Sequence, residues 1–183
     1  MNGPSVRTDL VTVLTFRTST GAPGAEPMQG IEWLQLRRAG EPMAGTWQPV
    51  MGSIEAGESA TEAAIRELRE ETGFVVGGDR GDGGDGGDPR GPRALWQLDG
   101  VHPFFLAQTD SIVLSPTFVV QVAPGTEPTL NREHDDARWV SNADADEAFM
   151  WPFQLASIAE ARRFIHQPCP ARRHLRVWPL RDH

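Results

Sequence analysis

The chain has 183 residues, which is long enough for a complete hydrophobic core, and we expect residues 1–183 to form a single domain. Its formal net charge of -8 argues against a general nucleic-acid-binding surface, because such a surface needs a basic face. A single cysteine excludes a disulfide framework and a cysteine-based zinc site, and it fits a reducing compartment. We find neither a signal-peptide pattern nor an apolar run of about 18 residues, so we expect a cytoplasmic protein without membrane contact.

The first part of the chain predicts strands followed by a helix. Residues 9–16 are rich in β-branched side chains, and residues 31–37 alternate between two faces, as strands do. Residues 47–50 predict another short strand. Residues 59–72 predict a strong helix.

The rest of the chain predicts more strands and two helices, at residues 95–106, 112–122, 137–140, 141–148 and 152–165. We expect the second of these strands to be interrupted near Pro116. Ser141 or Asn142 is the expected cap of the first helix, and Pro152 stands at the start of the second, where proline is favoured. This order of strands and helices indicates an α/β fold.

Two segments differ in composition from the rest. Residues 77–93 hold eight glycines, four aspartates, three arginines and two prolines, so they cannot bury apolar surface and predict a flexible insert. Residues 168–183 form a basic tail with four arginines and one aspartate. Because the whole chain is acidic, we interpret the tail as a surface segment or a homodimer contact rather than a nucleic-acid site.

Residues 52–74 carry the strongest signal for chemistry. Ser59 followed by Glu62 is a capping box that starts a helix, and Gly73 is a typical stop signal. Most side chains of this helix are polar or charged, so the arrangement of its charged residues around the helix axis is informative.

Three carboxylates share one face of this helix. At 100° per residue, Glu67, Glu70 and Glu71 fall within an arc of roughly 100°, and only alanines lie beside them. We therefore expect an exposed arc on which like charges repel, which a sequence selected for stability alone would avoid. A divalent cation would make the cluster favourable, since hard oxygen ligands suit Mg²⁺ or Mn²⁺. The alternative is a solvated surface in which Arg66 pairs with Glu70.

The spacing of the whole segment is more specific than its charge. Gly52 is followed after five residues by Glu58, and after seven more by Arg-Glu-Leu-Arg-Glu-Glu-Thr-Gly-Phe at residues 66–74. This pattern matches the Nudix box in full, and its seven fixed letters match by chance on the order of 10⁻⁹ times per start position. The chain therefore resembles the Nudix hydrolases, which hydrolyse a nucleoside diphosphate linked to another moiety.

The resemblance implies a fold and roles for the residues of the box. The implied fold is an α/β/α sandwich with a mixed β-sheet. The implied ligands of Mg²⁺ or Mn²⁺ are four carboxylates, Glu58, Glu67, Glu70 and Glu71. Arg66 would orient a carboxylate and thereby take part in catalysis with Glu70, while Gly52, Gly57 and Gly73 would shape the loops at the ends of the helix.

A weaker resemblance lies outside the box. Residues 47–53, the pair Glu133-His134 followed by Trp139, and the stretch 148–165 are similar to the bacterial dATP and dihydroneopterin triphosphate pyrophosphohydrolase branch. This resemblance makes Glu133 the candidate for the base or last ligand that the attacking water needs. Asp135 and Asp136 are close competitors, because they lie in the same polar loop.

Four further residues are candidates for substrate binding. Arg37 and Arg38 suit phosphate oxygens, although a solvated strand end is the alternative. Trp47 could stack on a base or a pterin ring, or belong to the core. His134 could orient the neighbouring carboxylate, touch the substrate, or be an ordinary loop histidine.

These observations predict a metal-dependent pyrophosphohydrolase that converts a (deoxy)nucleoside triphosphate or similar polyphosphate to the monophosphate and pyrophosphate. Dihydroneopterin triphosphate and dinucleoside polyphosphates are alternative substrates. A non-catalytic nucleotide-binding module is the alternative from another class, and its signature would be a damaged box. An RNA-end hydrolase that uses the basic tail is a further alternative, tested by the salt dependence of RNA binding.

Overall fold

The computed structural model describes residues 3–18, 30–77, 91–166 and 172–178. In chain order the elements are β1 (Ser5–Arg7), β2 (Leu10–Thr18), β3 (Ile31–Arg38), β4 (Trp47–Gln48), β5 (Val50–Ser53), α1 (Ala60–Thr72), β6 (Pro92–Gln97), β7 (Phe104–Leu106), η1 (Ala107–Thr109), β8 (Ser111–Val113), β9 (Thr117–Val122), β10 (His134–Ser141), α2 (Ala145–Ala148), α3 (Pro152–His166), α4 (Arg172–Leu175) and β11 (Arg176–Trp178).

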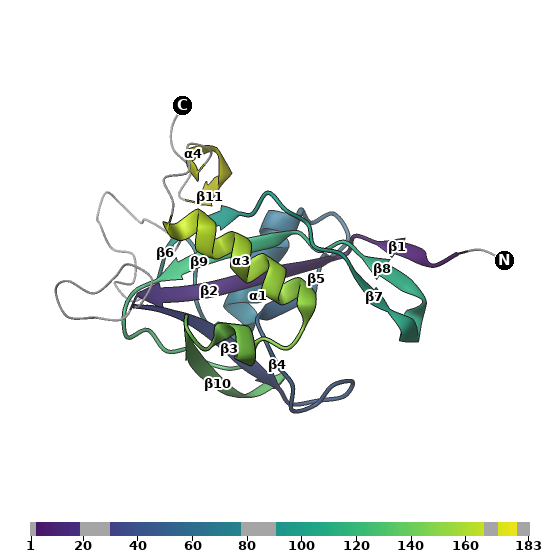
Figure 1. Ribbon diagram of the computed structural model, residues 1–183, viewed down its shortest axis with the longest axis horizontal. Helices are drawn as coiled ribbons and strands as arrows, with labels where there is room; N and C mark the ends of the chain where they lie inside the picture. Colours follow the sequence, from purple (N-terminus) through teal and green to yellow (C-terminus); the bar gives the residue numbers. More distant parts are fainter. Residues whose placement is uncertain (1–2, 19–29, 78–90, 167–171, 179–183) are drawn as a thin grey trace.

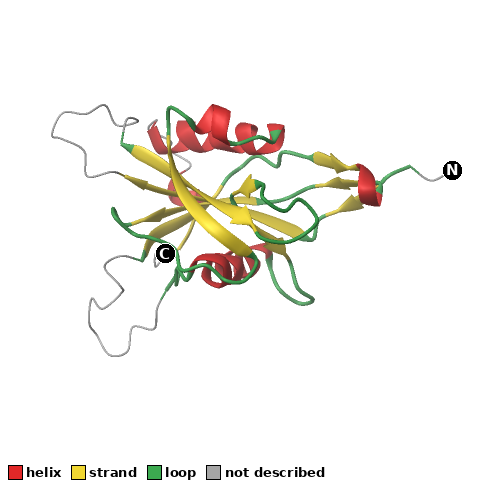
Figure 2. Cartoon of the chain, turned by 90° about the horizontal axis from the view of Figure 1, so that it is seen from below, coloured by secondary structure: helices red, strands yellow, loops and turns green. Residues whose placement is uncertain are grey.

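A mixed sheet forms the centre of the molecule. Its strand order is β10-β3-β2-β9-β6-β11, with β4 added to β3 and β5 to β2. The β2–β9 pair is parallel and its other pairs are antiparallel. Helices α1 and α3 cover opposite faces, so the chain forms three layers (Figures 1 and 2). The predicted α/β/α sandwich with a mixed sheet is confirmed.

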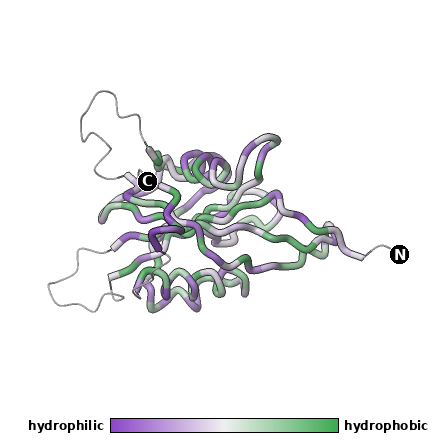
Figure 3. Tube along the Cα trace, turned by 90° about the horizontal axis from the view of Figure 1, so that it is seen from above, coloured by the Kyte–Doolittle hydropathy of each residue, from purple (hydrophilic) through white to green (hydrophobic). Residues whose placement is uncertain are grey.

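Each face of the sheet has its own core. Val11, Val13 and Leu34 pack with Leu68 of α1 on one side. Trp33 belongs to the cluster on the other side, with apolar residues of α3 such as Ile158 and Phe164. Figure 3 shows the hydrophobic positions gathered along the central strands, while the helices alternate between hydrophobic and hydrophilic residues. This alternation is what places one side of each helix against the sheet.

A second, smaller sheet extends beside the main one. It has the order β1-β8-β7, and its β1–β8 pair is parallel. The small sheet points toward the N-terminal end of the chain (Figure 1). The sequence did not predict β1, because a strand of three residues is too short to show a period.

Helix α1 begins and ends as the sequence predicted. The Ser59 hydroxyl accepts from the Glu62 backbone N–H, and the Glu62 carboxylate accepts from the Ser59 N–H, which completes the capping box. Gly73 ends the helix with a φ of 72°, in the left-handed region that favours glycine. The expectation that the carboxylates lie on an exposed arc is confirmed for Glu70, but it is wrong for Glu71, which belongs with Ala63 to the buried face. A helical wheel shows which residues share a face, but the sheet decides which face is covered.

Other boundaries differ in ways that have local causes. The expected strand at 95–106 is two strands, since residues 98–103 form no ladder between β6 and β7. The break near Pro116 is confirmed, because it separates β8 from β9. The cap of α2 is Asp144 rather than Ser141 or Asn142, because β10 continues through Ser141 before the chain turns.

The insert and the tail are described only in part. Residues 78–90 of the expected insert lie outside the described residues, and Pro92 and Arg93 belong to β6. In the expected tail, residues 172–178 form α4 and β11, and β11 pairs with β6 at the edge of the main sheet. No helix in the described ranges is long and apolar enough to span a bilayer.

Candidate active site

One guanidinium organises most of the carboxylates of the box. Arg66 Nε and Nη2 donate to the two carboxylate oxygens of Glu58, each at 2.9 Å. Its Nη1 donates to Glu67 Oε1 at 2.8 Å and to Glu70 Oε2 at 3.3 Å, and Nη2 also donates to the carbonyl of Ser53 at 2.7 Å. A planar fork of five N–H donors is suited to this task, because it pairs bidentately with one carboxylate and still has donors for others. These contacts bring Glu58, Glu67 and Glu70 together.

Gly52 makes room for one of these carboxylates. A Cβ added to Gly52 would collide with the Glu67 side chain, whose carboxylate lies against the glycine. The loop between β5 and α1 also contains Gly57, which has a φ of 84°. The structure thus places Gly52 at a close approach and Gly57 at a left-handed turn.

Glu71 differs from the other carboxylates, because it is buried with a residue exposure of 2%. Burial, with the nearby negative charges of Glu67 and Glu133, raises the pKa of Glu71 to about 9, while a hydrogen bond from the Met51 backbone N–H opposes the rise. Its Oε2 has no hydrogen-bond partner among the described residues. An unpartnered buried carboxylate oxygen costs free energy, so this atom is available to a ligand that supplies positive charge.

The carboxylate cluster has the right donors for a divalent cation but is not closed around one. Burial raises the pKa of Glu67, and Arg66 counteracts this rise. In the described part of the chain, no three Asp, Glu, His or Cys side chains stand in a finished metal-binding arrangement. Arg66 instead holds the carboxylates by hydrogen bonds. The hard oxygen donors and the free Oε2 of Glu71 fit Mg²⁺ or Mn²⁺.

Glu133 and His134 lie close to this cluster. The negative charge of Glu133 contributes to the raised pKa of both Glu67 and Glu71. His134 is buried, and its Nε2 lies 3.9 Å from Glu71 Oε2 and 3.5 Å from Gln48 Nε2. Burial lowers the pKa of His134, which favours the neutral ring.

The two competitors of Glu133 have partners of their own. Arg37 Nε donates to Asp135 Oδ1 at 2.7 Å, and Arg37 Nη1 lies 3.7 Å from Asp136 Oδ2. The hydrogen bond with Asp135 raises the pKa of Arg37. The two aspartates and Arg37 thus form one ion-pair cluster between β3 and β10.

Arg38 and Trp47 have different surroundings. Arg38 Nε donates to the Gly40 carbonyl at 3.2 Å. The positive charge of Arg38 opposes the rise in the pKa of Glu71. Trp47 lies on β4 beside Arg37, with the Arg138 guanidinium 4.2 Å from the ring centroid. Trp47 is therefore a half-buried partner of arginines rather than a core residue.

A cavity of about 660 Å³ adjoins the cluster, and we call it the α3 cavity. Arg38, Gln48 and Met51 form its wall toward the box, and the start of α3 and strand β7 form the opposite wall. Its apolar residues include Phe104 and Phe153, whose rings stack with centroids 4.3 Å apart. The size is in the range of small-molecule sites.

Sequence reasoning missed the residues of the α3 cavity that come from β7 and α3. Trp151, Phe153 and Gln154 flank the predicted helix start at Pro152. The Trp-Pro-Phe run shows where the helix begins, but it carries no signal that these side chains line a cavity. Nothing in the sequence showed that Phe104, about 50 positions earlier, would stack on Phe153.

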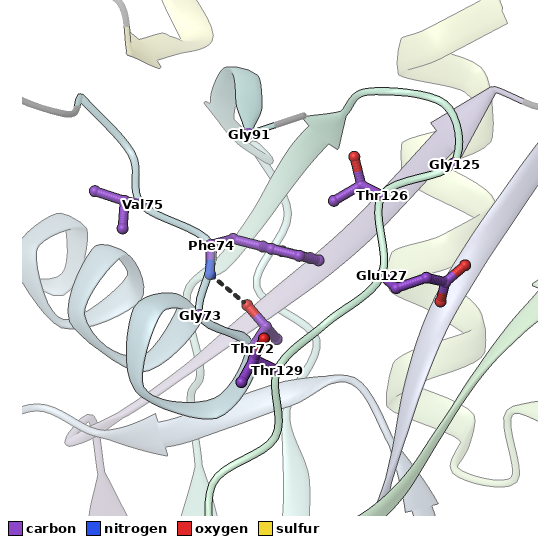
Figure 4. Close-up of a pocket in the computed structure, with 9 residues that line it drawn as sticks. All are labelled: Thr72, Gly73, Phe74, Val75, Gly91, Gly125, Thr126, Glu127 and Thr129. Carbon is purple, nitrogen blue, oxygen red and sulfur yellow. Dashed lines mark hydrogen bonds between the residues drawn. The ribbon is translucent and has the colours of Figure 1, made fainter. Parts of the chain in front are cut away.

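A second cavity, of about 380 Å³, lies at the C-terminal end of α1 (Figure 4). Thr126, Glu127 and Thr129 face the turn from Thr72 to Val75 across it, and the Phe74 N–H donates to Thr72 Oγ1 at 3.2 Å (Figure 4). The described lining of this cavity contains none of the four carboxylates of the box, although Thr72 directly follows Glu71 in the chain. The α3 cavity and the cluster beside it are therefore the candidate active site.

Comparison with known proteins identifies the family. A family model described as the NUDIX domain matches residues 15–161. The chain belongs to the NUDIX family. With its intact box it is a Nudix hydrolase, as the sequence predicted, and members of this family generally use divalent metals such as Mg²⁺ or Mn²⁺.

Solved structures of this family share the fold. An Ap4A hydrolase from C. elegans, solved as a binary complex, has 18% identity and a TM-score of 0.63, covering 87% of this chain and 98% of that one. A NUDIX hydrolase from Listeria monocytogenes has 23% identity and a TM-score of 0.61, covering 86% and 94%. The NUDIX domain of Shewanella oneidensis NrtR, complexed with ADP ribose, has 18% identity and a TM-score of 0.59, covering 89% of each chain. At these identities the likeness shows the fold alone.

One curated relative matches a shorter stretch. It is an octanoyltransferase from Myxococcus xanthus, 37% identical over 123 residues, which are 66% of this chain and 29% of that protein. The chain thus spans less than a third of the length of that relative.

Proposed function

We propose that this Nudix hydrolase is a Mg²⁺- or Mn²⁺-dependent pyrophosphohydrolase that converts a (deoxy)nucleoside triphosphate to the monophosphate and pyrophosphate. The observation that carries the proposal is that Glu71 Oε2, a buried carboxylate oxygen beside a cavity of nucleotide size, has no hydrogen-bond partner in the described part of the chain. Glu58, Glu67, Glu70 and Glu71 would hold the metal. When bound, a divalent ion neutralises charge on phosphate oxygens and lowers the pKa of a coordinated water.

The residues of this chain would divide the remaining work among themselves. Arg66 keeps Glu58 and Glu67 in place, and Arg38 at the cavity wall contacts the polyphosphate. Glu133 accepts the proton of the attacking water at its carboxylate, which needs hydrogen-bond reach of about 2.6–3.2 Å, directly or through one water. The water oxygen bonds to one phosphorus as the anhydride P–O bond breaks, and the leaving phosphate group keeps that electron pair.

The four predicted substrate contacts receive different support. Arg38 lies on the cavity wall, whereas the guanidinium of Arg37 is engaged by Asp135 and Asp136, so we propose Arg38 for the phosphate contact. Trp47 is held by arginines, and we propose no stacking role for it. His134 contacts Glu71 and Gln48, which suits the orientation of a carboxylate better than contact with substrate.

The resemblance to the dATP and dihydroneopterin triphosphate branch is part of this proposal, and so are the cytoplasmic location and a homodimer. We do not propose acyl transfer for this chain. The match to the octanoyltransferase spans only 29% of that protein, and the intact box is the signature of anhydride hydrolysis. The intact box also argues against a non-catalytic binding module.

A substrate panel tests the proposal. Nucleoside triphosphates, dihydroneopterin triphosphate and a dinucleoside polyphosphate are incubated with Mg²⁺ or Mn²⁺, and pyrophosphate is resolved from orthophosphate. We expect pyrophosphate release from a triphosphate and a loss of about 10² in kcat for Glu70→Gln, which removes one ligand charge. Absence of turnover on every polyphosphate would sink the proposal.

A further inference from the structure

The α3 cavity is placed to hold the part of a substrate that is not polyphosphate. Met51 lines it and donates its backbone N–H to Glu71, and Gln48 lines it beside His134. A molecule whose phosphates lie at the carboxylate cluster therefore extends its other end into this cavity. The stacked rings of Phe104 and Phe153, tilted by 21°, offer apolar and aromatic surface to a flat group.

One buried polar side chain in the wall of the cavity lacks a partner within the described ranges. Gln154 lines the cavity and is only 1% exposed. Both of its side-chain polar atoms, Nε2 and Oε1, lack a hydrogen-bond partner among the described residues. Leaving a buried donor and a buried acceptor unpaired is unfavourable, and a rotation of the flexible side chain into the cavity would let a ligand satisfy both. A carboxamide pairs with a group that presents a donor next to an acceptor.

The charges around the cavity restrict which flat group this is. Adenine presents an amino donor next to a ring acceptor, as the smaller cytosine ring also does, and glutamine is the usual bidentate partner of adenine. Guanine and pterin present two adjacent donors, which a carboxylate accepts best. None of the described side chains that line the cavity is an aspartate or a glutamate, and two are arginines, Arg7 and Arg38. The Gln154 carboxamide offers one acceptor and one donor, so a guanine or pterin edge with two adjacent donors would leave one of those donors unpaired on such a wall.

We propose that Gln154 is a specificity-determining residue that pairs with the adenine ring of an adenine nucleotide held in the α3 cavity. The inference rests on the proposed function for the position of the phosphates, and it selects adenine nucleotides over guanine nucleotides and dihydroneopterin triphosphate.

The test compares substrates with and without a base. We measure kcat/KM for ATP, GTP, CTP, dihydroneopterin triphosphate and inorganic tripolyphosphate, with wild type and Gln154→Leu. Wild type is expected to prefer ATP over GTP by about 10-fold or more, in line with one bidentate pair. Gln154→Leu is expected to lower kcat/KM for ATP about 10-fold and leave tripolyphosphate unchanged. Its Tm is expected to hold or rise, because an unpaired polar group is removed.

Two more variants separate base recognition from structure. Gln154→Glu supplies a carboxylate and is expected to move the preference toward GTP and dihydroneopterin triphosphate. Gln35→Leu is the matched control, since Gln35 is also fully buried but has partners for both of its groups, Ala148 and Arg138. This control is expected to lower Tm and to leave the ratio of ATP to GTP unchanged.

Binding without turnover distinguishes the failure of this inference from that of the proposed function. AMP and GMP are titrated by calorimetry in the absence of metal. Equal affinity for the two, or an unchanged AMP affinity in Gln154→Leu, would overturn the role of Gln154 whatever the enzyme hydrolyses. A preference for AMP that depends on Gln154, together with no turnover of any polyphosphate, would overturn the proposed function alone.

Discussion

At the residue scale, the candidate site depends on how closely the side chains of the box pack. The sequence predicted its residues, because the spacing is specific, and it predicted a contact of Arg66 with Glu70 from the i,i+4 rule. It did not predict that Arg66 would hold Glu58 and Glu67 more closely, at 2.9 and 2.8 Å, because those contacts depend on the path of the loop. The burial of Glu71 depends on where the sheet lies, which no pattern within one helix reports.

Gly52→Ala tests the close approach of Glu67. The new methyl group meets the Glu67 carboxylate, so that side chain must move away from its place. A displacement of about 1 Å can cost about 10² in rate, and we expect a loss of that order in kcat. The control is Gly40→Ala, since nothing lies within 4 Å of a Cβ at Gly40. Equal activity of the two variants, measured as pyrophosphate release, would show that the packing against Gly52 is irrelevant.

Glu133→Gln tests the candidate base. The variant keeps the size of the side chain but removes the proton acceptor, so kcat is expected to fall by about 10² or more with a small change in KM. Asp135→Asn and Asp136→Asn serve as controls from the same loop, and they are expected to change kcat little because both residues pair with Arg37. A larger loss of kcat in Asp135→Asn or Asp136→Asn than in Glu133→Gln would show that the aspartate, and not Glu133, is the base.

At the element scale, the long periodic segments were predicted well, and the predicted short strands at 47–50 and 137–140 correspond to β4 with β5 and to β10. Short elements without a pattern were missed. The strands β2 and β3 and the helices α1 and α3 agree with the predicted segments to within two residues at each end. The strand β11 was missed, since three residues in an arginine-rich segment carry no pattern. Its pairing with β6 is a long-range contact, and Arg172 of α4 lies 5.0 Å from the ring centroid of Trp96.

Trp178→Ala tests whether the tail belongs to the fold. Trp178 packs against the core on the α1 side, so its truncation is expected to cost about 2 kcal/mol, less than for a fully buried tryptophan. For a chain of this size, that corresponds to a fall in Tm of roughly 4–8 °C. Arg173→Ala, at an exposed position of α4, is expected to leave Tm unchanged. Equal melting curves for wild type and Trp178→Ala would show that the tail is a surface segment that does not stabilise the fold.

At the scale of the whole molecule, the two parts of the candidate site come from different layers. The carboxylate cluster belongs to α1 on one face of the sheet, and Gln154 and Phe153 belong to α3 on the other. Strands β4 and β5 connect them, since Met51 donates its backbone N–H to Glu71, Gln48 lies 3.5 Å from His134, and both residues line the α3 cavity. The sequence could predict the first part from its local spacing. It could not predict the second, because the cavity forms only when β1, β7 and α3 meet.

The stability of the metal-free protein should depend on pH through Glu71. Its folded pKa is about 9 against an ordinary value of 4.5, so the folded state binds more protons between these values. Stability should therefore fall as pH rises from about 5 to 9, because deprotonation leaves a charge buried near Glu67 and Glu133. Arg38 offsets part of this charge, and His134 contributes none once it is neutral.

Thermal melts at several pH values with a chelator measure this slope, and Glu71→Gln is the matched variant. Glutamine has no carboxylate to ionise, so the slope of Tm against pH should become flatter than in wild type. Addition of Mg²⁺ should raise the Tm of wild type most at high pH, where Glu71 is ionised, because an ion that binds only the folded state stabilises it by mass action. The same Mg²⁺ should raise the Tm of Glu71→Gln less. Parallel curves for the two proteins, with and without Mg²⁺, would contradict both the buried charge and its role as a metal ligand.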